Sequence, residues 1–197
     1  MDRYHVALFI HIVTLIVAVY ATAVTKLAVG RRTSARTVSE ALDWHAVLMS
    51  TSKLFPICLF AFTITGAYML SFAQPSVWGS GFIVAGLTGV VLLLASGVFL
   101  GVKGNALQQL LEGFAQRGLD QPAPKLAPPP IVAALPAINT GIAIAVVFDM
   151  VTKPASIPLA LMVVVLGILL GATAYLRRPA PVRNVVSAWV QADSPSM

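Results

Sequence analysis

Residues 157–176 read IPLALMVVVLGILLGATAYL, an uninterrupted apolar stretch without a charged side chain. A helix of about 20 apolar residues crosses roughly 30 Å of hydrocarbon, so this stretch is long enough to span a bilayer. Lipid offers no hydrogen-bond partners, and the backbone N–H and C=O groups must therefore pair within the segment, which favours a helix. This stretch predicts an integral membrane protein.

Four further stretches are long and predominantly apolar, and they cover residues 5–29, 52–72, 82–102 and 131–152. Of the 197 residues, 58% are hydrophobic and 10% are charged. Soluble domains are about 25% charged, so the composition excludes a soluble enzyme. We predict an all-α membrane protein with a bundle of five transmembrane helices in one domain, residues 1–176. The tail, residues 177–197, is predicted to be cytoplasmic and partly interfacial.

The connection between the third and fourth spans contains a further helical pattern. Within residues 103–118, apolar side chains recur at helical spacing at Ala106, Leu107, Leu110, Leu111 and Phe114. A helix with one apolar face and a polar opposite face is typical of a membrane surface. We predict an interfacial amphipathic helix here, followed by a proline-rich extended linker that leads into the fourth span.

The basic residues indicate how the chain is oriented. All thirteen Lys and Arg residues except Arg3 and Lys153 fall on one side of the predicted spans. Cytoplasmic segments carry an excess of Lys and Arg, so this side is predicted to be cytoplasmic and the N-terminus to be outside. The predicted location is the bacterial inner membrane. An alternative is a signal peptide cleaved after Ala23, but this would leave the basic residues 26–36 outside, against the same rule.

Small residues indicate how the helices pack against one another. Gly97 and Gly101 form a GxxxG motif on the third span, and Gly167 and Gly171 form another on the fifth. Such motifs let two helix backbones approach closely in lipid. We predict packing within the chain, and the alternative is a homodimer formed through the fifth helix.

A few polar side chains lie deep in the predicted spans, and three of them share one depth. With a rise of about 1.5 Å per residue, His11, Tyr68 and Asp149 all fall in the outer leaflet. Ionisable groups inside a membrane are costly and are therefore functional hypotheses. A carboxylate beside an imidazole can hold a cation or pass a proton. We predict a metal or cation site of His11, Asp149 and Met150, with Tyr68 and Lys153 as further polar members.

Structural roles are the alternative interpretation of the same residues. Asp149 and Lys153 are four positions apart, which is a common spacing for a surface ion pair on a helix. His11 would then hydrogen-bond only to a neighbouring hydroxyl or backbone group. Met150 would be an ordinary packing residue. The sequence leaves both interpretations open.

Few residues in the sequence bear on cofactor or enzyme chemistry. The thioether of Met150 suits Cu(I), so copper is one candidate ion, although the sequence does not identify the cofactor. A bis-histidine haem is not expected, because His11 is in the outer leaflet while His45 is at the cytoplasmic edge. Beside Trp44, His45 is predicted to anchor at the membrane interface. The sequence shows no nucleophile–base pair, HExxH motif or phosphate loop, and we predict no enzymatic activity.

Four short motifs carry a resemblance to a known family: FIHIVTLIVAVYATAVTKLAVGRR at 9–32, TITGAYML at 63–70, VWGSGFIVAGLTG at 77–89 and FDMVTKP at 148–154. Together they make the chain similar to a family of small bacterial integral membrane proteins of unknown function. That family in turn resembles the membrane domain of copper-resistance D proteins. The residues that the resemblance singles out are His11, Gly66, Asp149, Met150, Lys153 and Pro154.

Two hypotheses for the function follow. The first is a polytopic inner-membrane protein that binds or passes a small cation or a proton at the outer-leaflet polar cluster. The alternative is a non-catalytic structural subunit of a larger membrane complex. The expected partners are the lipid bilayer and either another membrane protein or a second copy of the chain, and nucleic acid is not expected.

Overall fold

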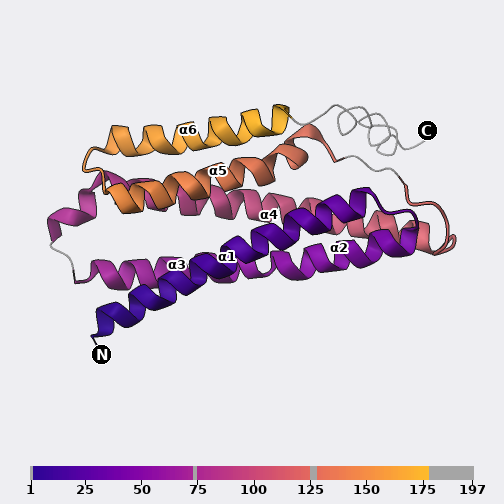
Figure 1. Ribbon diagram of the computed structural model, residues 1–197, viewed down its shortest axis with the longest axis horizontal. Helices are drawn as coiled ribbons and strands as arrows, with labels where there is room; N and C mark the ends of the chain where they lie inside the picture. Colours follow the sequence, from indigo (N-terminus) through magenta and orange to yellow (C-terminus); the bar gives the residue numbers. More distant parts are fainter. Residues whose placement is uncertain (1, 73–74, 125–127, 178–197) are drawn as a thin grey trace, which may run out of the picture.

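The computed structural model describes residues 2–72, 75–124 and 128–177 (Figure 1). Its elements, in chain order, are α1 (Arg3–Thr33), α2 (Val38–Ser52), α3 (Leu54–Leu70), η1 (Pro75–Gly79), α4 (Gly81–Ala115), α5 (Pro130–Thr152) and α6 (Ile157–Leu176). Five segments of this part of the chain are long and apolar enough to cross a membrane, and α2 and α3 together form one of them. The predicted all-α bundle of five membrane-spanning segments is confirmed. The predicted interfacial part of the tail, residues 178–197, lies outside the described residues.

Helix α2 occupies most of the basic connection that follows α1. Thr37 caps it, because its Oγ1 accepts a hydrogen bond of 3.2 Å from the backbone N–H of Glu40. The carboxylate of Glu40 returns to accept a bond of 2.9 Å from the backbone N–H of Arg36. This arrangement is close to a capping box, whose signature is a Thr followed three residues later by a Glu. The cap explains why a helix begins here, outside the apolar stretch.

Pro56 explains why the helix is interrupted between α2 and α3. Proline has no N–H to donate to the carbonyl of Ser52, and its ring crowds that carbonyl. The helix is accordingly interrupted at Lys53, which is the only residue between α2 and α3. The two helices nevertheless form one membrane-spanning segment. The interruption therefore lies three residues before Pro56 in the chain.

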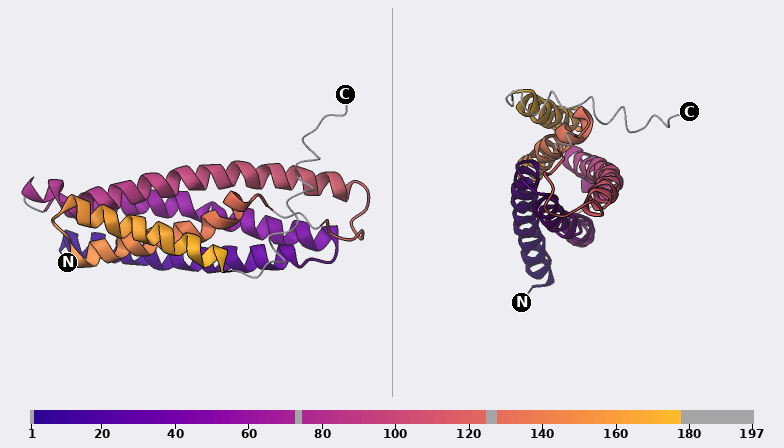
Figure 2. Two further views of the ribbon diagram at one scale, coloured as in Figure 1. Left: turned by 90° about the horizontal axis from the view of Figure 1, so that it is seen from above. Right: turned by 90° about the vertical axis from the view of Figure 1, so that its right-hand side faces the viewer.

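Residues 103–115 differ from the sequence prediction. They are the last part of the long helix α4 and not a separate interfacial helix. Leu107 and Leu111 are buried against Ala41 of α2, so the apolar face of this segment packs on protein. Figure 2 shows α4 continuing past the ends of its neighbours as one unbroken helix. An apolar face of this kind suits a membrane surface or a partner helix equally well, and here α2 is the partner.

Helix α1 packs on α2 and α3 through a seven-residue repeat. Its buried residues are Ala7, Thr14, Ala21 and Ala28. Seven-residue spacing keeps these small side chains on one seam, as in a coiled coil. Ring contacts fix the antiparallel register with α3: Tyr4 meets Phe72 with ring centroids 6.2 Å apart, and His11 meets Phe62 at 4.8 Å.

Helices α5 and α6 pack at backbone distance through glycines. A Cβ atom placed on Gly141 would collide with the carbonyl oxygen of Gly167. A Cβ atom on Gly167 would lie 2.5 Å from the carbonyl oxygen of Gly141, and one on Gly171 would lie 2.5 Å from that of Ala137. Only glycine permits this approach, which small-residue motifs provide in membranes. The Gly167 motif therefore packs within the chain, as predicted.

A groove of about 3080 Å³ runs between the two groups of helices. Helix α1 packs mainly on α2 and α3, whereas α5 packs mainly on α4 and α6, so α4 joins the groups (Figure 2, right). Gly97 and Gly101 of α4 line the groove, and a Cβ atom on either would have nothing within 4 Å. The second GxxxG motif is therefore not in contact with another helix of the described chain.

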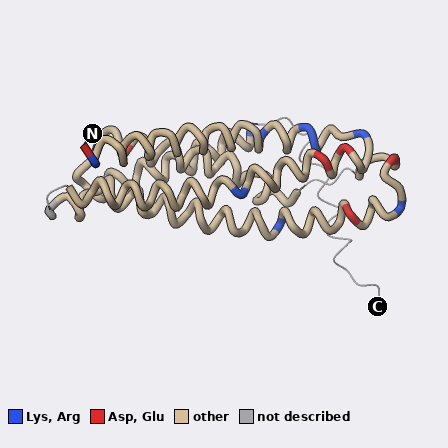
Figure 3. Tube along the Cα trace, turned by 90° about the horizontal axis from the view of Figure 1, so that it is seen from below, with Lys and Arg blue, Asp and Glu red and all other residues tan. Residues whose placement is uncertain are grey.

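The basic residues gather toward the end of the bundle where α1 meets α2 (Figure 3). We call this the basic end and define it by Lys26, Arg31, Arg32, Lys53 and Lys103. The N-terminus of α1 and the turn between α5 and α6 lie at the opposite end (Figure 1). The uneven distribution of Lys and Arg along the sequence therefore also makes the two ends of the folded bundle different in charge.

Candidate functional site

His11 belongs to a hydrogen-bonded pair between α1 and α3. Its Nδ1 lies 2.8 Å from Oγ1 of Thr65, and that hydroxyl donates to the carbonyl oxygen of Ala61 at 2.6 Å. Because the Thr65 proton is used in this way, the ring Nδ1–H must be the donor between the two side chains. The lone pair then sits on Nε2 of a side chain that lines the groove. A neutral imidazole of this kind can accept a proton or bind a metal ion.

Asp149 is sealed inside the other group of helices. Its side chain is 0% exposed, and neither carboxylate oxygen has a hydrogen-bond partner among the described residues. With Ile142 and Ala145 it forms the buried face of α5, which packs on α4 and α6. An ionised carboxylate buried without a partner costs several kcal/mol. This group therefore requires a proton or a cation to be stable where it lies.

The remaining members of the predicted site make separate contacts, although Met150 and Lys153 line the same groove as His11. Met150 packs toward α4, since a Cβ atom on Gly86 would collide with its Cε. The ring of Tyr68 stands edge-on to Phe72, with centroids 5.2 Å apart. Lys153 ends α5 in the left-handed conformation, and its backbone N–H donates to the carbonyl oxygen of Asp149 at 2.8 Å.

The structure therefore does not join the predicted ligands to one another. Among the described residues, no hydrogen bond or ion pair links Asp149 to His11 or to the ammonium group of Lys153. The same residues contain no group of three or more His, Cys, Asp or Glu side chains suited to a metal ion. The three-residue metal site thus stays a prediction, while Asp149 alone has the features of an ion or proton site.

His45 is the centre of a hydrogen-bond network at the basic end, and this network was not predicted from the sequence. Its side chain is 1% exposed, so it is buried in protein and does not anchor at the interface. Nη1 of Arg32 donates to Nδ1 of His45 at 3.1 Å, and Nε2 of His45 donates to the carbonyl oxygen of Gly104 at 3.1 Å. One imidazole thereby links α1, α2 and α4. A histidine at the edge of a span gives no sequence signal for such a role, because its partners are distant in the chain.

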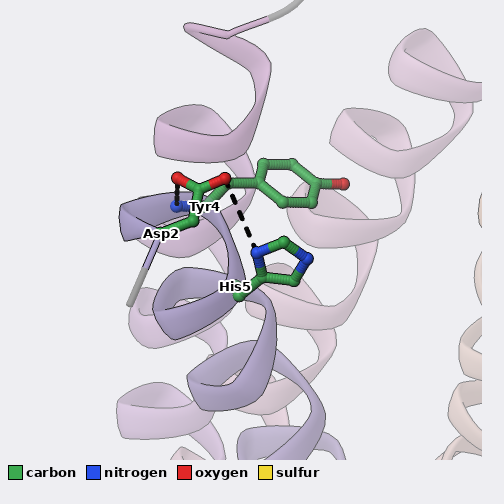
Figure 4. Close-up of polar contacts among 3 residues, drawn as sticks. All are labelled: Asp2, Tyr4 and His5. Carbon is green, nitrogen blue, oxygen red and sulfur yellow. Dashed lines mark hydrogen bonds and ion pairs between the residues drawn. The ribbon is translucent and has the colours of Figure 1, made fainter.

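The third histidine, His5, lies in the first turn of α1, beside the residue that caps this helix. Asp2 is the N-cap, and its carboxylate accepts a bond of 3.3 Å from the backbone N–H of Tyr4 (Figure 4). Its other oxygen lies 3.6 Å from Nδ1 of His5. A carboxylate at this position satisfies a free N–H group and complements the helix dipole. His5 is exposed at the end of the helix and takes no part in the candidate site.

A half-buried amide contact joins α4 and α5. Asn139 of α5 accepts a hydrogen bond of 2.9 Å from the hydroxyl of Ser96 on α4. Polar side chains within membrane bundles commonly pair across helices in this way. This bond supports the α4–α5 contact and has no evident chemical role.

The helices define the class of the molecule, which is a multi-pass membrane protein, and its described residues form an apolar groove and bury the carboxyl group of Asp149. Comparison with protein-family models, with curated proteins and with solved structures finds no match for this chain.

Proposed function

We propose that this multi-pass membrane protein binds or passes a proton or a small cation at Asp149, in the outer half of a bacterial inner membrane. The observation that carries the proposal is the carboxyl group itself, which is fully buried and whose two oxygens have no hydrogen-bond partner in the described part of the chain. A proton or a bound cation neutralises this group, and either one removes the cost of a bare buried charge. The basic end is proposed to be the cytoplasmic side.

His11 is the second titratable group in this proposal. It lines the groove and presents its free Nε2 lone pair there, whereas Asp149 lies on the face of α5 that packs on α4 and α6. We assign Asp149 as the resident site and His11 as the group that exchanges protons with the groove. The resemblance to copper-resistance D proteins makes Cu(I) one of the cations to be tested.

Replacing Asp149 with Asn is expected to remove a protonated carboxyl group from the folded protein. Infrared spectra of the reconstituted protein at neutral pH should show a carboxylic acid C=O band that Asp149→Asn abolishes. Asp43→Asn is the matched control, because Asp43 is exposed on α2 and should leave the band unchanged. If the site instead holds a cation, equilibrium binding of Na⁺ or Cu(I) should weaken at least tenfold in Asp149→Asn. A wild-type protein with neither the band nor any cation binding would refute the proposal.

The orientation proposed for the chain has an all-or-none test. Alkaline phosphatase, which is active only outside the cytoplasm, should be active when fused within residues 74–80. A fluorescent protein that folds only in the cytoplasm should be bright when fused within residues 122–130. The physical reason is the excess of basic residues at one end of the bundle. The reverse pattern would show that the basic end faces outward.

The second candidate function is a structural subunit of a larger membrane complex. The open GxxxG motif at Gly97 and Gly101 favours it, because helices approach closely at such motifs and none of the described helices does so here. A membrane protein that co-purifies in fixed proportion, and is lost in Gly97→Leu, would support this candidate.

A further inference from the structure

We propose that the basic end of the groove binds the phosphate of an anionic phospholipid, whose acyl chains lie along the apolar walls of the groove. This site is separate from Asp149, which does not line the groove. Among the described residues that line the groove, four basic side chains lie toward the basic end, namely Lys26, Arg32, Lys53 and Lys103, and none of the lining residues is acidic. A fifth, Lys153, lies at the opposite end, where α5 ends. Basic pockets between transmembrane helices are typical binding sites for anionic headgroups.

Arg32 is the central residue of the proposed site. A guanidinium carries five N–H donors, and only one of those in Arg32 makes a hydrogen bond in the described structure, to Nδ1 of His45. The other donors are not sealed in the interior. His45 is itself fixed by its bond to the carbonyl oxygen of Gly104, so the orientation of Arg32 is set in advance. A guanidinium held in this way is suited to a bidentate bond with phosphate oxygens.

Three lysines lie near the same level of the bundle. His11 meets Thr65 across the antiparallel α1–α3 pair. Counting from these two positions toward the basic end, Lys26 is level with Ser50, which is about one helical turn from Lys53. On α4, Lys103 directly precedes Gly104, the partner of His45. The described part of the chain has one ion pair within 4.0 Å, between His5 and Asp2, so these charges have no carboxylate partner of their own.

The rest of the groove favours a lipid over a soluble anion. Its walls are apolar sections of membrane-spanning helices, so a ligand must be charged at one end and hydrocarbon along the remainder. Gly97 and Gly101 precede Lys103 on α4 by less than two helical turns, and the open space beside these glycines can hold an acyl chain. A partner helix in the same place would have to bring acidic side chains to the basic end, and this is an outcome that the experiment detects.

The test uses the full chain, purified in a non-ionic detergent and analysed by native mass spectrometry. Phosphatidylglycerol and phosphatidylcholine with identical acyl chains are titrated separately. We expect at least tenfold tighter binding of phosphatidylglycerol, and a loss of about tenfold in Arg32→Gln. Arg31→Gln is the matched control, because Arg31 is exposed on the same turn and does not line the groove; its affinity should change less than twofold.

A second variant separates lipid binding from folding, since Arg32→Gln also removes the hydrogen bond to His45. The double variant Lys26→Gln, Lys53→Gln changes only exposed side chains, and it should weaken phosphatidylglycerol binding several-fold. Equal affinity for the two lipids, or equal losses in Arg31→Gln and Arg32→Gln, would overturn the proposal. Displacement of the lipid by millimolar inorganic phosphate would indicate a soluble-anion site, and a protein bound in place of lipid would indicate helix docking; both results would also overturn it.

Discussion

Gly141→Ala and Gly167→Ala should each destabilise the bundle by about 3 kcal/mol, at the upper end for an overpacked interior. Each added methyl would meet the backbone of the opposite helix, which cannot move aside as a side chain can. The two helices must separate to make room, and the backbone contact that holds α5 to α6 is then lost along its length. Unfolding of the purified protein in detergent, followed by circular dichroism, measures the change.

Gly97→Ala and Gly101→Ala provide the matched comparison. They make the same chemical change within a membrane-spanning helix, but the new methyl has nothing within 4 Å. Alanine has the higher helix propensity, by up to about 1 kcal/mol, so these variants should be as stable as the wild type or slightly more stable. Similar losses at all four positions would show that the contact between α5 and α6 is less close than described.

The membrane-spanning segments could be predicted from the sequence because bilayer thickness fixes their length. The segment predicted at 157–176 coincides with α6, and that at 131–152 differs from α5 by one residue. In both cases charged or proline-rich residues border the apolar stretch closely. Hydropathy depends only on the side chains in such a stretch, so it is most informative where a helix ends near the membrane surface.

Helices that continue beyond the apolar stretches could not be predicted in the same way. Helix α2 begins at a capping box, and the last part of α4 uses Leu107 and Leu111 to pack against it. Both signals are present in the sequence. Their meaning depends on a partner helix, however, because an apolar face that fits a membrane surface also fits another helix.

The sequence could predict how far along its helix each residue of the candidate site lies. It could not predict which neighbouring helix each side chain faces. The position of a residue along a span follows from the rise per residue, so His11 and Asp149 could both be placed toward the end of the bundle that is opposite the basic end. Which neighbour each side chain faces depends on how the helices are arranged around the bundle. His11 forms a hydrogen bond with Thr65 of α3, whereas Asp149 lies on the face of α5 that meets α4 and α6. The unpaired state of Asp149 is likewise a property of the folded chain alone.

His45→Ala should destabilise the bundle by about 2–3 kcal/mol, because it leaves buried polar partners unsatisfied. The change removes the acceptor of Arg32 and the donor to the Gly104 carbonyl, and with them the link between α1, α2 and α4. His5→Ala is the control: His5 is exposed, and its loss should change stability by less than about 0.5 kcal/mol.

The location of the effect distinguishes this network from general damage to the bundle. Hydrogen exchange of His45→Ala should increase in α2 and in residues 104–115 of α4, which meet at His45 and at the Leu107 cluster. Exchange in α5 and α6 should stay unchanged, since their glycine contact does not involve this end of α4. His45→Gln keeps a donor and an acceptor, and it should recover part of the lost stability. Uniformly faster exchange in all helices would mean that His45 is only one packing residue among many.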